Sequence, residues 1–478
     1  MELTRRHALA GAAALAATPL LPQAPANAAA PVADKQAPSF YRYKVGDAQV
    51  TAISDGVNNF ALPDTFVLNA KKDEVNAALE KNFMPKDKMS IQFAPLVINT
   101  GGKLVVIDTG NGAAAFASSK GNVGQFAANM VAAGFDPKAV DMVVISHFHG
   151  DHINGLLTAE NAAAFPNAEV LVPAAEWKYF MDDGEMSRAP EGRMQAVFKN
   201  ARRVFEAGLS KKVTPYEWGK EVAPGLTAME TIGHTPGHTS YVLASGADKV
   251  FIQSDVTNLP ALFVTNPGWH LMFDQDPAMA EATRRKIYDM LVADKMRVQG
   301  FHYPFPANGF VEKDGNGYRL VPAAELKYFM DDGEMSRAPE GRMQTVFKNA
   351  RRVFEAGLKK KATPYEWGKE VAPGLTAVET IGHTPGHTSY VLSSGSDKVF
   401  IQSDVTNLPA LFVTNPGWHL MFDQDPALAE KTRRRVYDML VADKMRVQGF
   451  HYPFPANGYV EKDGNGYRLV PAPWSPVI

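Results

Sequence analysis

The chain has 478 residues, with 49 lysines and arginines against 51 aspartates and glutamates, and it contains no cysteine. The near-neutral balance argues against a nucleic-acid-binding protein, whose binding face is usually strongly basic. The absence of cysteine excludes disulfides, thiolate zinc sites and a cysteine nucleophile. No uncharged apolar run long enough to span a membrane follows residue 40, so we expect no membrane-spanning helix.

The N-terminus has the features of an export signal. Arg5 and Arg6 precede an apolar stretch rich in alanine and leucine, followed by small residues that suit a signal peptidase. The segment resembles a twin-arginine signal, with Ala8 where phenylalanine is usual; an ordinary secretory signal is the alternative. We therefore expect residues 1–30 to be a signal peptide and residues 31–39 a flexible lead-in. The mature protein would be exported, periplasmic or secreted.

Strand and helix patterns alternate along residues 40–320. Runs of strand-forming residues around Gly-Asp and Gly-Gly pairs predict two hairpins, and a short, wholly apolar run predicts a strand buried on both faces. Apolar residues at helical spacing predict helices. In chain order, we expect strands at 41–45, 48–53, 94–99, 104–107, 142–145 and 170–172, and helices at 123–133, 194–209 and 277–290. This mixture indicates a layered α/β domain with sheets inside and helices outside.

The sequence of the second half of this unit occurs twice in the chain. Residues 172–320, which we call copy one, recur at 321–469, which we call copy two, with 12 differences in 149 positions. One repeat of this length indicates a partial duplication, because solenoids repeat every 20 to 50 residues or so. We expect one enzyme-sized domain at 40–320, a duplicated half-domain at 321–469 and a tail at 470–478.

Three of the 12 histidines lie within six residues of one another, directly after the apolar run at 142–145. The motif, residues 147–152, reads His-Phe-His-Gly-Asp-His. On a strand or helix these side chains would face different ways, whereas a tight loop lets them converge. Imidazole with carboxylate is a ligand mix that divalent transition metals prefer. The motif therefore predicts a metal site; a polar loop without metal is the alternative.

Three further segments follow in order: Gly-His-Thr-Pro-Gly-His at 233–238, Asp255 after a serine, and His302 after a phenylalanine. Together with the motif at 147–152 they resemble the metallo-β-lactamase superfamily over residues 40–320. The resemblance implies that family's α/β fold, a four-layer αβ/βα sandwich with a two-metal site at one edge of its sheets. In this chain the sandwich would carry an extra, duplicated C-terminal half-domain.

The same resemblance implies a complete set of metal ligands. They are His147, His149 and His234 for one metal, Asp151, His152 and His302 for the second, and Asp255 as the carboxylate that bridges both. Two cations about 4 Å apart can lower the pKa of a shared water towards neutrality. Nitrogen and oxygen ligands suit zinc, although manganese, cobalt or iron also fit. We therefore expect two divalent ions, with Asp151 and Asp255 as the catalytic carboxylates.

Two more polar residues are expected next to the ligands. Asp108 ends the strand at 104–107 and resembles the family's aspartate that orients a ligand histidine; the alternative is an aspartate that only starts a turn. His238 follows His234 by four residues, and the implied ligand set is complete without it. We expect His238 to stabilise its loop or to support a ligand.

Copy two repeats the second group of ligands as His383, Asp404 and His451. These residues form an alternative set that would complete the site in place of copy one. We expect copy one to do so, because it is synthesised first and can pack against residues 40–171 before copy two is available. Copy two would then expose apolar surface, which invites a homodimer, a domain swap or aggregation.

Within the superfamily, the sequence favours hydrolysis of ester-like bonds. Lactamases with a cysteine ligand are excluded, and other dinuclear β-lactamases usually lack a bridging carboxylate such as Asp255. Segments 41–56, 165–168 and 302–309 resemble the methyl parathion hydrolase-like and acyl-homoserine lactonase-like group. The resemblance implies that a metal-bridging hydroxide attacks an organophosphate triester, an aryl ester or a lactone.

No cluster of lysines or arginines lies near the motif, which favours a neutral small-molecule substrate. Two alternatives stay open. One is a glyoxalase-type thioesterase, although the helical segment that would bind glutathione is not found in the sequence. The other is a non-catalytic, metal-binding remnant of the duplicated gene. We expect neither nucleic acid nor a membrane as a partner.

Overall fold

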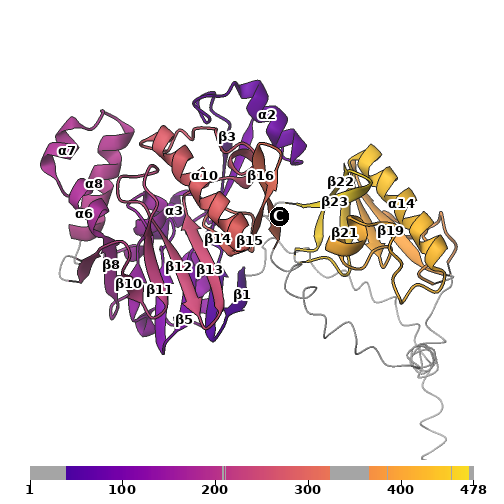
Figure 1. The fold of residues 1–478 in the computed structure, drawn as a ribbon, viewed down its shortest axis with the longest axis horizontal. Helices are drawn as coiled ribbons and strands as arrows, with labels where there is room; N and C mark the ends of the chain where they lie inside the picture. The colour runs from indigo at the N-terminus through magenta and orange to yellow at the C-terminus, as the bar shows by residue number, and fades with distance from the viewer. Residues whose placement is uncertain are drawn as a thin grey trace, which may run out of the picture. The chain divides into compact units, whose positions relative to one another are not determined.

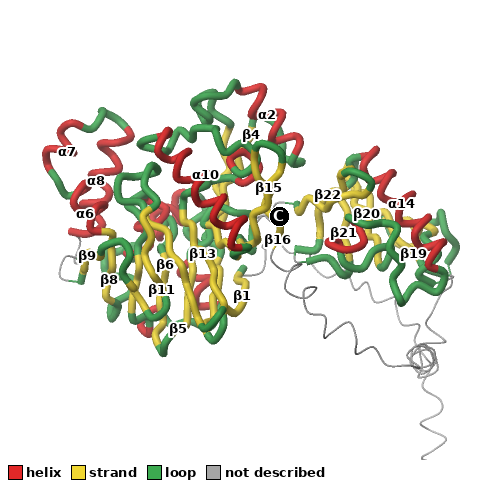
Figure 2. Tube along the Cα trace, viewed as in Figure 1, coloured by secondary structure: helices red, strands yellow, loops and turns green. Residues whose placement is uncertain are grey.

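The computed structural model of the protein describes most of the chain, namely residues 39–206, 209, 212–322, 365–384, 386–453 and 455–472. Several regions with sequence-based predictions lie wholly or mostly outside the described residues. They are the signal peptide at 1–30, the lead-in at 31–39, the start of copy two at 323–364 and the end of the tail at 473–478. Figure 1 labels the described elements, and Figure 2 colours them by type.

The first half of the domain, together with the start of copy one, builds a mixed seven-stranded sheet with the order β1-β2-β5-β6-β7-β8-β9. Its strands are β1 (Phe40–Val45), β2 (Ala48–Ile53), β5 (Leu96–Thr100), β6 (Lys103–Ile107), β7 (Met142–Val144), β8 (Glu169–Pro173) and β9 (Val213–Tyr216). Both predicted hairpins form, because β1 pairs with β2 and β5 with β6 in antiparallel register. The apolar strand β7 runs parallel to β6 and β8 on either side, with Val143 and Val144 fully buried.

Copy one builds most of a second seven-stranded sheet, in which the strands follow chain order. They are β10 (Glu221–Ala223), β11 (Leu226–Glu230), β12 (Thr239–Ser245), β13 (Asp248–Ser254), β14 (Arg297–Gly300), β15 (Asn308–Asp314) and β16 (Gly317–Pro322). Only β13 and β14 run parallel in this sheet. The two sheets face each other, since Val50 and Ile98 of the first share one buried cluster with Tyr241 and Ile252 of the second.

Helices cover the outer face of each sheet, as Figure 1 shows. The helices and short helical turns are α2 (Lys72–Lys81), α3 (Gly112–Ser118), α4 (Phe126–Ala132), η1 (Pro137–Ala139), α5 (Gly150–Ile153), η2 (Asn154–Leu156), α6 (Ala174–Phe180), α7 (Asp183–Arg188), α8 (Arg193–Glu206), α9 (Pro260–Phe263) and α10 (Pro277–Asp294). Met130 of α4 and Phe198 of α8 pack with Val143 of the first sheet. Ile287 of α10 packs with Phe251 of the second. The four-layer αβ/βα sandwich is thereby confirmed.

A small hairpin that the sequence analysis missed lies next to the sandwich. It consists of β3 (Gly56–Ala61) and β4 (Lys88–Phe93), and α2 lies between them in the chain. Phe66, Leu79 and Met89 of this region share a buried cluster with Phe263 and Phe301 from copy one. The hairpin therefore covers the part of the second sheet that carries His302.

Copy two forms a third seven-stranded sheet with the same strand order as copy one. Its elements are β17 (Glu370–Ala372), β18 (Leu375–Glu379), β19 (Thr388–Ser394), β20 (Asp397–Ser403), η5 (Pro409–Val413), α14 (Pro426–Asp443), β21 (Arg446–Gly449), β22 (Asn457–Asp463) and β23 (Gly466–Pro471). The register is repeated too, since Tyr390 lies opposite Ile401 as Tyr241 lies opposite Ile252. None of the described helices is long and apolar enough to cross a membrane.

The helix predicted at 123–133 begins later, at Phe126 of α4. Gly124 has a φ of 80°, which a right-handed helix does not allow. The carboxylate of Asp55 then accepts hydrogen bonds from the backbone N–H of Phe126, at 2.8 Å, and from both the backbone and the side chain of Asn111. Asp55 therefore joins the end of β2 to the starts of α3 and α4.

Asp55 is expected to make folding stability fall as the pH rises. Burial raises the pKa of its carboxyl to about 6, against 3.8 when exposed, although the hydrogen bonds from Asn111 oppose this shift. The folded chain thus holds a proton that the unfolded chain has released, so the stabilisation is complete below about pH 4 and lost above about pH 6. Two pKa units correspond to about 3 kcal/mol. Urea unfolding at pH 4.5 and 7 should show about 2 kcal/mol of this change in the wild type and not in Asp55→Asn.

Candidate metal centre

The histidine motif lies where β7 ends, at the edge of the first sheet. His147 and His149 precede α5, and Asp151 and His152 belong to that single helical turn. A turn this short after a buried strand lets side chains two and five residues apart face the same space. The second sheet supplies His234 and two further residues from its own loops and strand ends, so the site lies between the two sheets.

The structure brings the seven predicted ligands into two groups. Within each group the ligand atoms lie within 4.8 Å of one another; the groups are His147, His149 and His234, and then Asp151, His152, Asp255 and His302. Asp255 lies between them. Its Oδ2 is 3.0 Å from Nε2 of His302 and 3.3 Å from Nε2 of His234, and its Oδ1 is 3.4 Å from Nε2 of His152.

Three buried atoms of these groups have no hydrogen-bond partner. They are Nε2 of His149, Nε2 of His152 and Oδ1 of Asp255. A buried polar atom without a partner costs about 1–3 kcal/mol, so proteins rarely leave several at one place. Nitrogen and carboxylate oxygen are the atoms that bind divalent transition metals. The residues present therefore fit two metal ions.

The pKa values of the histidines divide them into two kinds. Burial, together with His152 and His149, lowers the pKa of His147 well below its usual range. Burial opposes protonation of His234 as well, but its hydrogen bonds to Asp255 and Asp274 raise its pKa to about 9. A metal ion binds only neutral imidazole, so an ion that binds here displaces a proton from His234. The affinity of the site for metal therefore falls at low pH.

Asp108 and His238 lie behind the ligands, outside the two groups. Asp108 Oδ2 is 2.8 Å from Nδ1 of His152, and Asp108 also accepts from the backbone N–H and hydroxyl of Ser146. His238 donates from Nδ1 to the carbonyl of Thr231, at 2.9 Å, and its Nε2 accepts from the backbone N–H of Asp255, at 3.0 Å. Asp108 thus orients the ring of His152, and His238 holds the backbone of Asp255.

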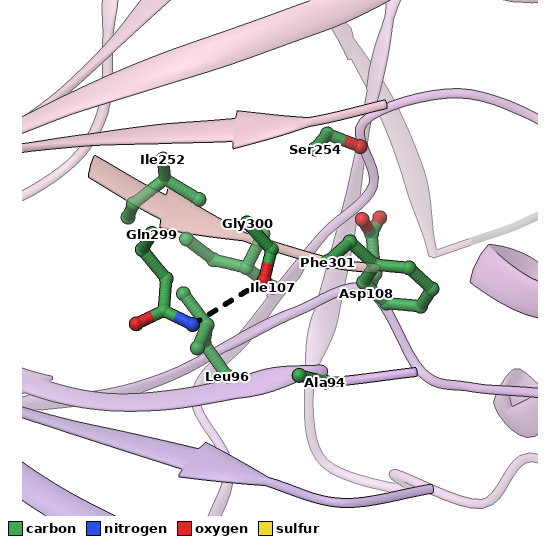
Figure 3. Close-up of a pocket in the computed structure, with 9 residues that line it drawn as sticks. All are labelled: Ala94, Leu96, Ile107, Asp108, Ile252, Ser254, Gln299, Gly300 and Phe301. Carbon is green, nitrogen blue, oxygen red and sulfur yellow. Dashed lines mark hydrogen bonds between the residues drawn. The ribbon is translucent and has the colours of Figure 1, made fainter. Parts of the chain in front are cut away.

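A small cavity between the two sheets adjoins the site (Figure 3). It is lined by Ala94, Leu96, Ile107, Asp108, Ile252, Ser254, Gln299, Gly300 and Phe301. The Phe301 ring stacks on the ring of His152, with 3.9 Å between their centroids. Largely apolar surroundings strengthen the electrostatic interactions between ligands and ions, because little water is present to screen them.

The sequence did not reveal Asp274, which contacts His234 although the two residues are far apart in the chain. Its Oδ1 is 2.7 Å from Nδ1 of His234, and its Oδ2 is 3.5 Å from the guanidinium of Arg284. A carboxylate behind a ligand histidine fixes the ring and raises its basicity. Asp274 lies 40 residues after His234 in no recognisable motif, so only the fold identifies it.

Glu176 is a second residue that the sequence did not reveal. Its fully buried carboxylate accepts from the backbone N–H of Phe148, at 2.9 Å, and from the hydroxyl of Thr235 and the backbone N–H of Gly237, at 2.9 and 2.8 Å. Burial raises the pKa of Glu176 to about 7, although these three donors oppose the shift. Glu176 therefore connects the loop of the motif to the loop that carries His234.

Replacing Glu176 with alanine is expected to weaken metal binding by about 10- to 100-fold, because the two ligand loops lose their common acceptor. Glu176→Gln keeps an acceptor oxygen and should restore part of the affinity. Competition with a chelator measures this directly, and Glu191→Ala, at an exposed position, is the control. An unchanged metal affinity in Glu176→Ala would show that the loops hold their positions without this carboxylate.

The alternative ligands of copy two lie together but do not join the motif. Nε2 of His451 is 3.1 Å from Asp404 Oδ1, and Nε2 of His383 is 3.6 Å from Asp404 Oδ2. Their side chains are 18–38% exposed, whereas those of His234, Asp255 and His302 are 3–4% exposed. Among the described residues, both groups able to hold a metal draw on copy one and none draws on copy two.

Comparisons with known proteins agree with this geometry. Residues 95–291 match the profile of the Metallo-beta-lactamase superfamily. The solved structure of AidC, described as a dizinc quorum-quenching lactonase, is 24% identical with a TM-score of 0.55, covering 60% of this chain and 97% of its own. AbOPH, a hydrolase of the beta lactamase superfamily, is 26% identical with a TM-score of 0.56, covering 60% of this chain and 98% of its own.

A curated relative gives a shorter match. An N-acyl homoserine lactonase from Bacillus sp is 27% identical over 110 residues, which are 23% of this chain. The chain spans 35% of that relative's length. The matched profile and the four-layer fold lead to one conclusion: residues 95–291 belong to a domain of the metallo-β-lactamase superfamily, and an extra sheet-rich C-terminal region lies beyond the matched part.

Proposed function

We propose that the protein hydrolyses the ester bond of a small, neutral, lactone-like substrate with two divalent metal ions, in the first instance zinc. The observation that carries the proposal is the position of Asp255, whose carboxylate lies within 3.0–3.4 Å of ligand nitrogens from both groups. Two relatives support the substrate class, because AidC and the Bacillus protein are both described as lactonases. Aryl esters and organophosphate triesters offer the same kind of electrophilic centre.

When bound, two such cations lower the pKa of a shared water molecule and polarise the oxygen of the bond to be broken. The chain's own residues hold the ligands in place for this chemistry. Asp108 and Asp274 accept from the Nδ1 atoms of His152 and His234, so the Nε2 atoms are the ones left for metal. His238 accepts from the backbone N–H of Asp255 and thereby holds the bridging carboxylate.

Asp151 differs from the other six ligands because it is half-buried, whereas they are buried. Its Oδ2 is 3.5 Å from Nε2 of His302 and 3.6 Å from Nε2 of His152. A carboxylate at the open side of the site can take a proton from the attacking group and return it to the leaving oxygen. In our proposal Asp151 therefore carries the proton, and Asp255 holds both metal positions together.

Among the described residues, Arg193 is a cation close to the motif. The guanidinium of Arg193, which helps to lower the pKa of His149, donates to the carbonyl of Met272 and stacks 4.2 Å from the centroid of the Phe273 ring. An arginine held in this way binds an anionic group weakly, because tight binding of phosphate or carboxylate usually needs a guanidinium with its parallel N–H donors free. This observation supports a neutral substrate.

Metal analysis of the full chain, followed by a substrate panel, tests the proposal. We expect about two divalent ions per chain, and turnover of N-acyl homoserine lactones above that of aryl esters, a neutral phosphotriester and a glutathione thioester. Preference for the thioester would support the glyoxalase-type alternative. A chain that retains no metal and turns over none of the four would be the non-catalytic remnant.

A further inference from the structure

The sheet of copy two has two different faces. One face packs on α14, where Phe400 and Val447 share a buried cluster with Val436 and Leu440 of the helix. The strand register places apolar side chains on the opposite face as well, for example Leu392 beside Leu375 and Val399. We call this opposite side the open face. Nine apolar residues line it. Eight belong to the sheet (Val371, Ala372, Leu375, Ala377, Tyr390, Leu392, Val399 and Ile401), and the ninth, Tyr365, precedes β17 and has its hydroxyl 2.6 Å from that of Tyr390.

The same nine positions in copy one carry identical residues and are all buried. They belong to the cluster that joins the two sheets of the sandwich, and their exposed fractions are at most 8%. Tyr216 lies on β9 of the first sheet, and the others lie on the second: Val222, Ala223, Leu226, Ala228, Tyr241, Leu243, Val250 and Ile252. In copy two, Ala377 alone of the nine is buried, while Tyr365 is 48% and Leu392 is 43% exposed. A contiguous apolar patch of this kind marks an interaction surface.

The number of sheets per chain decides what can cover the open face. Each chain has one N-terminal half, residues 40–171, and two copies of the second half. The first sheet already covers copy one. If the second sheet of copy two replaced that of copy one, in the same chain or in another, the sheet of copy one would be released with its eight residues of this face uncovered. Every arrangement therefore leaves one open face per chain, and another chain offers an identical face in equal number.

We propose that the open face of copy two is a homodimer interface, in which two chains pack their open faces against each other about a two-fold axis. Such an interface is isologous, so one patch must complement itself. Sheets that pack face to face lie about 10 Å apart and interdigitate their side chains. In copy one this face already packs against another sheet in that way, so its side-chain pattern suits a second sheet.

The polar residues of the open face agree with self-association. By register, Asp397 and Arg446 lie on this face with Val399, and both are exposed. A face with both signs of charge at its rim can be placed opposite its own copy without net repulsion. In copy one the counterpart of Arg446, Arg297, lies 4.8 Å from the ring of Tyr43 in the facing sheet. The tyrosines of a second open face would give Arg446 an equivalent partner.

The oligomeric state of the full chain tests this proposal. Sedimentation velocity over a dilution series should show a dimer that dissociates to monomer. Leu392→Lys places a charge in the middle of the patch and should raise the dissociation constant at least about 100-fold. Ser396→Lys adds the same charge in the exposed turn between β19 and β20 and should leave it unchanged. A monomeric wild type, or a dimer that persists in Leu392→Lys, would overturn the proposal.

A second measurement, thiol labelling, tests the same interface without placing a charged lysine in the sheet. Because the chain has no cysteine, Ile401→Cys and Ser396→Cys each carry one thiol. We expect a maleimide to react with the thiol at 401 slowly in the dimer and at least about tenfold faster after dilution to monomer, while the thiol at 396 reacts equally fast in both. Equal rates at position 401 before and after dilution would mean that the dimer uses another surface, which overturns the proposal.

Exchange between chains is a separate outcome of the test. If copy two sat on the first sheet of a partner, the partner's His383 would replace His234 in the site. His234→Ala would then keep both metals, and the face-to-face arrangement would be wrong. Loss of metal from His234→Ala in a chain that is still dimeric is the expected result, and it stands whether or not the proposed substrate class is correct.

Discussion

Asp255→Ala is expected to lower hydrolysis by at least about a thousandfold, equal to about 4 kcal/mol of transition-state stabilisation, and to leave fewer than two metals per chain. The reason is the position of this one carboxylate between both ligand groups. Although burial alone would raise the pKa of Asp255, His302 and His152 lower it well below its usual range, so it is an anion at every working pH. Its removal leaves His152 and His234 without the negative charge that they share.

Metal content and kcat/KM of the purified variant measure this effect. The matched control is Asp248→Ala, because Asp248 lies at the opposite, exposed end of the same strand β13. We expect the control to keep both metals and normal turnover. An Asp255→Ala protein with two metals and full activity would show that the carboxylate does not connect the two positions, and the ligand assignment would then be wrong.

The paired variants His234→Ala and His383→Ala are expected to differ as strongly. The two histidines lie in identical local sequences, and each has an aspartate at its Nδ1: Asp274 at 2.7 Å for His234 and Asp423 at 2.9 Å for His383. The two histidines differ in what surrounds the other ring nitrogen, Nε2. His234 Nε2 lies 2.9 Å from Nδ1 of His149, whereas His383 belongs to none of the described groups that could hold a metal.

His234→Ala should therefore lose a metal and at least about a thousandfold in kcat/KM, equal to about 4 kcal/mol. His383→Ala should keep both metals and stay within about twofold of the wild type, because a substitution outside the site and away from the core changes little. Each variant is the control for the other, since the chemical change is the same. The reverse result would place copy two in the site, and equal partial losses would mean that both arrangements coexist.

Much of the site could be predicted because its information is local. The spacing of residues 147–152 after a buried strand requires a loop in which imidazoles and a carboxylate converge. The resemblance to the metallo-β-lactamase superfamily then implied that His234, Asp255 and His302 complete the ligand set. The hairpins and β7 were equally predictable, because turn residues and two-sided burial leave direct patterns in the sequence. The fold class followed from the alternation of these elements.

The supporting residues could not be predicted, because their partners are distant in the chain. Glu176 serves loops 28 and 61 residues away, and Asp274 serves a histidine 40 residues away. Similarly, Asp55 decides where α4 begins through a hydrogen bond to Phe126, 71 positions later. A carboxylate with no neighbouring partner in the sequence looks like any surface carboxylate until the fold buries it.

The sequence by itself determined the duplication and the motif at residues 147–152, because both follow from residue identity and spacing. The full ligand set was implied by the resemblance to the metallo-β-lactamase superfamily. Only the tertiary structure shows that, among the described residues, those of copy one lie beside the motif. The 12 differences between the copies include none of His234, Asp255 and His302, so the two copies are chemically equal at the ligands. They differ in what covers them: one first sheet exists per chain, and it buries the face of copy one and leaves the identical face of copy two open.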